Sequence, residues 1–190
     1  MSAVLQLQDD RERIYARLTS ATINTPNQKW LASMIASWCV GRGALPDYLG
    51  LEPGQFKAVS ARFQAYPIPE QAASGHSLDF SRMLEKEDLV NLLKQHAATK
   101  SADTDIMIAM IVAGCLGSDH LWQDLGLWSR VQLSELLQYN FPALAAKNDK
   151  DMKWKKFLYK QLCEMEGLYL CRAPSCDVCI DYGKCYGSES

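Results

Sequence analysis

Four cysteines near the end of the chain are the residues whose type and spacing could do chemistry. They are Cys171, Cys176, Cys179 and Cys185, in the spacing C-x4-C-x2-C-x5-C. Four thiolates on one short loop can converge on a single metal centre. The rest of the 190 residues shows no arrangement typical of catalysis, so we do not expect an enzyme that turns over a small substrate.

The spacing of these cysteines leaves several chemistries open. Structural zinc sites with four cysteines usually use two C-x2-C-type pairs with a longer spacer, whereas this loop has one such pair. Ligation from one compact loop suits a cubane iron–sulfur cluster better, and we favour that interpretation. The alternatives are a zinc-stapled helical interaction protein and an iron–sulfur DNA-binding enzyme. The second needs a DNA-binding hairpin, which we do not find, and a net charge of −2 gives no drive toward nucleic acid.

Composition predicts a globular protein that is neither secreted nor embedded in a membrane. The chain is 48% hydrophobic and 22% charged, as is usual for a globular domain. Seven cysteines without an apolar signal segment indicate reduced thiols and a cytoplasmic location. The longest apolar run, from Ile106 to Leu116, is too short to span a bilayer and predicts a buried helix.

Helical periodicity dominates the sequence and predicts an all-α fold, with no convincing strand. We expect one helical domain over residues 1–170, and a cysteine-rich loop over 171–190 that belongs to the same unit and binds the cluster. Thr25, Ser101 and Ser129 are typical helix-capping residues. The expected helices cover about 3–20, 26–40, 56–63, 83–93, 101–116, 129–141 and 151–166.

Four stretches of the sequence carry a family resemblance: 115–127 (CLGSDHLWQDLGL), 155–163 (KKFLYKQLC), 171–176 (CRAPSC) and 181–185 (DYGKC). They resemble the NifQ family of nitrogen-fixation proteins. The resemblance implies an iron–sulfur cluster, either 4Fe–4S or Mo–Fe–S, held by all four loop cysteines. It also implies that molybdate is the cargo and that molybdenum is delivered to the synthesis of the iron–molybdenum cofactor of nitrogenase. The implied partners are the nitrogenase iron protein and the cofactor scaffold complex.

His120 is a further candidate ligand, because molybdenum in such a cluster needs ligands beyond cysteine. It follows a predicted helix break at Gly117. The simpler interpretation, that His120 packs against or caps a helix end, is favoured. Asp124 is expected to be a solvated or capping carboxylate, and Trp122 and Trp128 are expected in the core.

Cys163 is a further candidate metal ligand beside His120. The last helix has an apolar stripe at 3.6 residues per turn. Cys163 lies away from that stripe and shares a face with lysines. It follows the stretch from Lys147 to Lys160, where six lysines and two aspartates give a charge of +4. Cations there could stabilise an anionic cluster, an oxoanion or an acidic partner. Cys39 and Cys115 are expected in the core. The stripe consists of Trp154, Phe157, Leu158, Leu162 and Met165, and the lysine face of Lys153, Lys156 and Lys160.

Overall fold

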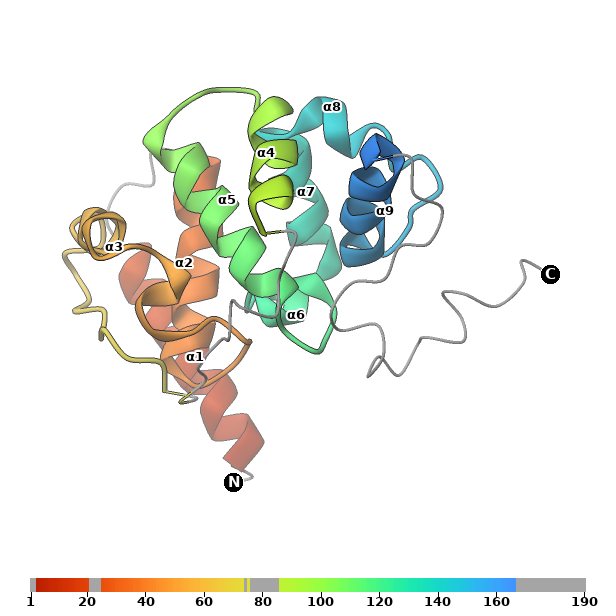
Figure 1. Cartoon of the computed structure of the whole chain (residues 1–190). Helices are drawn as coiled ribbons and strands as arrows, with labels where there is room; N and C mark the ends of the chain where they lie inside the picture. Colours follow the sequence, from red (N-terminus) through yellow and green to blue (C-terminus); the bar gives the residue numbers. More distant parts are fainter. Residues whose placement is uncertain (1–2, 21–24, 74, 76–85, 167–190) are drawn as a thin grey trace.

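The chain forms a bundle of helices in a computed structural model that describes residues 3–20, 25–73, 75 and 86–166 (Figure 1). The expected all-α class is confirmed for these residues, which contain helices and no strand. The loop 171–190 and its four cysteines lie outside them. The α-helices are α1 (Ala3–Leu18), α2 (Pro26–Cys39), α3 (Pro53–Ser60), α4 (Lys86–Gln95), α5 (Ala102–Cys115), α6 (Leu121–Asp124), α7 (Arg130–Asn140), α8 (Pro142–Ala145) and α9 (Trp154–Glu166), and a 3-10 helix, η1, covers Asp47–Gly50.

Three helices begin at hydroxyl residues that the sequence marks as caps. In each, the side-chain oxygen accepts a hydrogen bond from a backbone N–H of the first turn, which has no partner inside the helix. The predicted starts of α2, α5 and α7 are therefore confirmed. The bonds join Thr25 to Gln28 at 3.3 Å, Ser101 to Thr104 at 3.2 Å and Ser129 to Gln132 at 3.2 Å.

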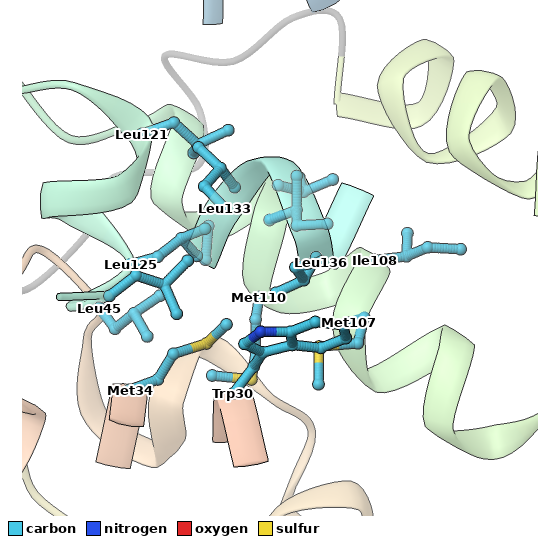
Figure 2. Close-up of a cluster of buried hydrophobic side chains, with 14 of the residues drawn as sticks. Trp30, Met34, Leu45, Met107, Ile108, Met110, Leu121, Leu125, Leu133 and Leu136 are labelled. Atoms are coloured by element: carbon cyan, nitrogen blue, oxygen red, sulfur yellow. The ribbon is translucent and has the colours of Figure 1, made fainter. Parts of the chain in front are cut away.

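Helix α5 crosses the middle of the bundle, with α2 and α3 on one side of the view and α4 and α7 on the other (Figure 1). Nearly all of its residues from Ile106 to Cys115 are buried, so the apolar run is a central helix, as expected. In α2, every residue from Trp30 to Trp38 is buried as well. Side chains of both helices meet those of α6 and α7 in one core (Figure 2). Within the described residues, no helix has the length and apolar character needed to cross a bilayer.

The last helix begins later than its sequence indicates. It starts at Trp154 and not near Asp151, because Asp151 has a φ of +50° and lies in a turn. This turn is stabilised from two directions. Arg130 donates to the backbone oxygen of Asp151 at 2.8 Å and to its carboxylate at 2.7 Å. The Asn148 side chain accepts the backbone N–H of Met152 at 2.8 Å.

The helix expected to end near Pro142 ends at Asn140, as predicted. Pro142 is then the first residue of the short helix α8, where its missing N–H costs nothing. The helix expected over 56–63 ends at Ser60, although Phe63 just beyond it is buried in the core. The start expected near residue 83 lies outside the described residues, and the described helix α4 runs from Lys86 to Gln95.

Candidate functional site

Helix α9 is the last described element before the four-cysteine loop in the sequence. It ends at Glu166, and Cys171 follows five residues later. Four of the five apolar residues expected in its stripe are buried, and the helix packs against α4. Met165 was expected in the stripe, but its side chain is 58% exposed. Leu162 is the last buried apolar residue, because among the described residues nothing covers the final turn of α9.

Cys163 is half-buried on α9, and two of the three lysines expected beside it share its face. Lys156 and Lys160 precede it by seven and three residues, a spacing that places side chains on one side of a helix. Lys160 forms an exposed ion pair with Glu164 at 3.6 Å. Lys153 precedes the first residue of α9 and so is not part of this helical face.

A fourth lysine of the same segment is buried and does not belong to the solvated face. The Lys155 ammonium donates a 2.8 Å hydrogen bond to the backbone oxygen of Gly117 and forms an ion pair with Asp124. The side chains are 9% and 3% exposed, respectively. The pair joins the start of α9 to α6 and to the loop after α5. The expectation of a solvated Asp124 is therefore wrong, because Lys155 supplies the charge that allows the carboxylate to be buried.

The surroundings of Asp124 are close-packed. A Cβ on Gly117 would lie 2.3 Å from the Asp124 carboxyl carbon, so the absence of a side chain there makes room for the carboxylate. The other carboxylate oxygen accepts the backbone N–H of Asp119 at 3.3 Å. Burial raises the pKa of Asp124, and the charge of Lys155 partly opposes that effect. Gly117, Asp124 and Lys155 thus form a close-packed polar joint, by which α9 is attached to α6 within the apolar bundle.

His120 lies beside this joint as the N-terminal capping residue of α6. Its backbone N–H donates to the side-chain oxygen of Gln123 at 3.3 Å. The capping interpretation is therefore supported by the structure. The distance from His120 to the four-cysteine loop involves residues outside the described ranges, and its role as a metal ligand stays a prediction.

Two other cysteines behave as core residues to different extents. Cys115 is fully buried, as expected, and desolvation raises the pKa of its thiol to about 12. Cys39 is only half-buried at the edge of the core, and burial raises its pKa to about 11. Trp122 and Trp128, expected in the core, are half-buried instead. No group of three or more His, Cys, Asp or Glu side chains suited to a metal ion occurs in the part of the chain described here.

The buried pair of Lys155 and Asp124 is the feature that our sequence reasoning missed. A signal was present, because Lys155 precedes Leu158, Tyr159 and Leu162 by three, four and seven residues. That spacing places it on the buried face of α9. A lysine within an apolar stripe needs a buried partner, and a carboxylate elsewhere in the chain is the usual one.

Comparison with known proteins supports the resemblance drawn from the sequence. The sequence model of the NifQ family matches residues 30–187, a range that contains all four loop cysteines. Protein NifQ of Azotobacter vinelandii is 37% identical over 174 residues, covering 86% of this chain and 89% of that protein.

Two further relatives match over different lengths. Protein NifQ of Klebsiella pneumoniae is 33% identical over 168 residues, covering 85% of this chain and 99% of that protein. A NifQ homologue of Sinorhizobium fredii is 45% identical over 104 residues, covering 55% of this chain and 45% of that protein. No solved structure matches the chain significantly.

Proposed function

We propose that this chain, which belongs to the NifQ family, is a molybdenum carrier and not an enzyme. Membership of the family gives it a role in nitrogen fixation and in the biosynthesis of the iron–molybdenum cofactor. In this proposal Cys171, Cys176, Cys179 and Cys185 hold an iron–sulfur cluster that takes up molybdenum. The observation that carries the proposal is the set of four thiolates within fifteen residues, all inside the range matched by the family.

The donor set fits an iron–sulfur cluster. Thiolates are soft ligands and select such clusters, whereas carboxylates and carbonyls select hard cations. When bound, the cluster would supply sulfide, which can hold molybdenum that arrives as a hard oxoanion. His120 and Cys163 are proposed to complete the molybdenum site.

The described residues support the proposal by fixing the helix that precedes the loop in the sequence. Lys155 attaches the first turn of α9 to Asp124 and Gly117, and the buried stripe attaches the following turns. Helix α9 is therefore fixed to the bundle and carries Lys156 and Lys160 on an accessible face. These cations can attract the anionic cargo or an acidic partner. The proposed partners are the nitrogenase iron protein and the cofactor scaffold complex, in the cytoplasm.

Metal and sulfide analysis of anaerobically purified protein tests this function. We expect iron, acid-labile sulfide and molybdenum in the wild type, and loss of all three in the double variant Cys176→Ala/Cys179→Ala. Cys39→Ala is the matched control, because Cys39 lies at the edge of the helical core and should leave iron content unchanged. Stoichiometric zinc without sulfide would instead support a zinc-stapled interaction protein. Full iron occupancy in the double variant would rule out the proposed ligands.

Two further variants separate molybdenum binding from cluster binding. His120→Ala should retain iron and lose molybdenum if the imidazole is a ligand. Normal molybdenum content would leave His120 only its capping role. Replacing Lys156 and Lys160 with glutamate should weaken molybdenum loading or transfer, because it reverses the charge beside the cargo. Unchanged loading and transfer would identify these lysines as ordinary solvated residues.

A further inference from the structure

A second candidate site lies away from the cysteine loop, in a pocket between α2 and the segment from Leu116 to Leu127. The pocket has a volume of about 440 Å³. Two arginines line it, Arg11 from α1 and Arg42 from the turn after α2, together with the hydroxyl residues Ser37 and Ser118. A pocket with this lining is suited to a small, polar, negatively charged ligand.

The two arginines of this pocket form no ion pair with a carboxylate among the described residues. Glu12, the next residue after Arg11 in the chain, acts on the Arg11 charge without such a pair. The Arg11 guanidinium instead lies over the Trp128 ring, 4.4 Å from its centroid. Burial and then the nearby charge of Arg42 lower the pKa of Arg11, while the charge of Glu12 raises it. Two arginine charges held close together favour the binding of an anion.

Donors without partners also lie in the wall of the pocket. The Nε atom of Arg11 and the hydroxyl of Ser37 are buried and have no hydrogen-bond partner in the structure. Buried polar atoms are nearly always paired, so two unpaired ones in one wall require an explanation. An anion can accept hydrogen bonds from arginine and serine.

The backbone holds Arg42 in place. The backbone N–H of Arg42 donates to the backbone oxygen of Ser37 at 2.9 Å. The N–H of Ala44 donates to the backbone oxygen of Asp124 at 2.8 Å. Gly43 has a φ of +90°, and a Cβ there would lie 2.9 Å from the Asp124 oxygen. The turn that carries Arg42 is thus packed against the buried joint, and little ordering is left for a ligand to impose.

The two carboxylates in the lining do not cancel the arginines. Asp124 is neutralised by the ion pair with Lys155 described above. Asp119 is exposed, so water screens its charge. The half-buried arginines are screened less, which leaves a positive pocket.

We infer that this pocket binds a small tetrahedral oxoanion through Arg11, Arg42 and Ser37. Molybdate, sulfate and phosphate share this chemistry. The identification of the ligand with molybdate rests on the proposed function, because a carrier needs to capture the oxoanion before its molybdenum enters the iron–sulfur cluster. The anion site itself does not depend on that function.

Isothermal titration calorimetry of the full chain with sodium molybdate, sulfate and phosphate, at one fixed ionic strength, tests the inference. We expect saturable binding of at least one of these anions, and the anion bound most tightly is then identified as the ligand of the pocket. Arg42→Gln should weaken that binding about tenfold or more, because it removes a charge-assisted interaction. Arg13→Gln, on the same helix as Arg11, is the charge-matched control, because the Arg13 side chain is 70% exposed and does not line the pocket, and it should change nothing.

Two results would overturn the inference: no saturable binding of any of the three anions, or equal affinities in Arg42→Gln and Arg13→Gln. If Arg42→Gln does not fold, as judged by circular dichroism, Ser37→Ala replaces it with a smaller expected loss of affinity. The double variant Cys176→Ala/Cys179→Ala separates this inference from the proposed function. It should lose iron and keep the anion site, whereas loss of anion binding with the iron would place the anion at the cysteines.

Discussion

Two buried polar pairs, one neutral and one charged, join distant parts of this chain. Asn27 and Asn140 connect α2 to α7, with each side-chain amide donating to the other at 2.9 and 2.7 Å. Asn140 also donates to the backbone oxygen of Leu136 at 3.0 Å. Asp124 and Lys155 connect α6 to α9 through an ion pair.

The difference between the pairs lies in what surrounds them. The amide pair is enclosed in the bundle, and its two side chains supply hydrogen-bond partners to each other without any charge. Asp124 of the ion pair lines a pocket, and its backbone oxygen accepts the N–H of Ala44 in the turn that carries Arg42. Its carboxylate binds Lys155 on the helix that precedes the cysteines. A buried ion pair is a weak source of stability, because desolvation opposes the attraction. Its position here is better explained by what it orients.

The largest expected effect comes from removing one charge of the ion pair. Lys155→Met should lower the free energy of unfolding by about 3–5 kcal/mol, because it leaves the Asp124 carboxylate buried without a cation. Urea unfolding followed by circular dichroism measures this. Lys160→Met on the same helix is the control and should change stability by less than about 0.5 kcal/mol, since its ion pair is exposed. Equal effects of the two substitutions would show that the charged pair is not a special joint.

A methyl group introduced beside the ion pair should have the next largest effect. Gly117→Ala places a Cβ 2.3 Å from the carboxyl carbon of Asp124, a side chain that Lys155 holds in place. We expect a loss of about 1–3 kcal/mol in thermal or urea unfolding. Gly54→Ala, where a Cβ meets nothing within 4 Å, should be neutral or slightly stabilising. If Gly117→Ala leaves the free energy of unfolding unchanged, the Asp124 carboxylate is free to move away from the new methyl group.

The neutral pair should be easier to replace as a unit than to break. Asn27→Ala leaves the Asn140 amide without its partner and should cost about 1–3 kcal/mol. Replacing both asparagines with leucine should cost less than the sum of the two single leucine substitutions, because no unpaired polar group remains. Double-mutant cycles in urea measure this coupling. If the effects of the two leucine substitutions on the free energy of unfolding are additive, Asn27 and Asn140 do not stabilise the fold as a pair.

The smallest expected effect is a pH dependence that only the charged pair should show. Burial raises the pKa of Asp124 above its ordinary value of 3.8, so the folded chain binds a proton there more readily than the unfolded chain does. Its contribution to stability is therefore greatest below pH 3.8 and falls as the pH rises through the folded-state pKa.

Calorimetry from about pH 3.5 to about pH 7 should reveal that trend. The stability of the wild type relative to Asp124→Asn should decrease as the pH rises. The effect of Asn27→Ala should stay constant, because neither amide titrates. The opposite trend in the first comparison would show that the attraction of Lys155 outweighs desolvation.

Much of the fold could be predicted because its signals are local. The hydroxyl caps Thr25, Ser101 and Ser129 begin helices as expected, since a cap bonds to residues within one turn of itself. The run from Ile106 to Leu116 is too apolar to be anything but buried. The boundary at Asp151 could not be predicted, because the turn there depends on Arg130, twenty-one residues away.

The candidate site divides along the same line. The four cysteines, their spacing and their membership of the NifQ family follow from the sequence, because metal ligation depends on residue type and short-range spacing. By itself, the sequence also determined the all-α class and most of the helix starts. Only the tertiary structure showed that Lys155 is buried with Asp124, and that Arg11 and Arg42 share a pocket. Those contacts join residues about thirty apart, and partners at such separations are chosen by the packing of whole helices.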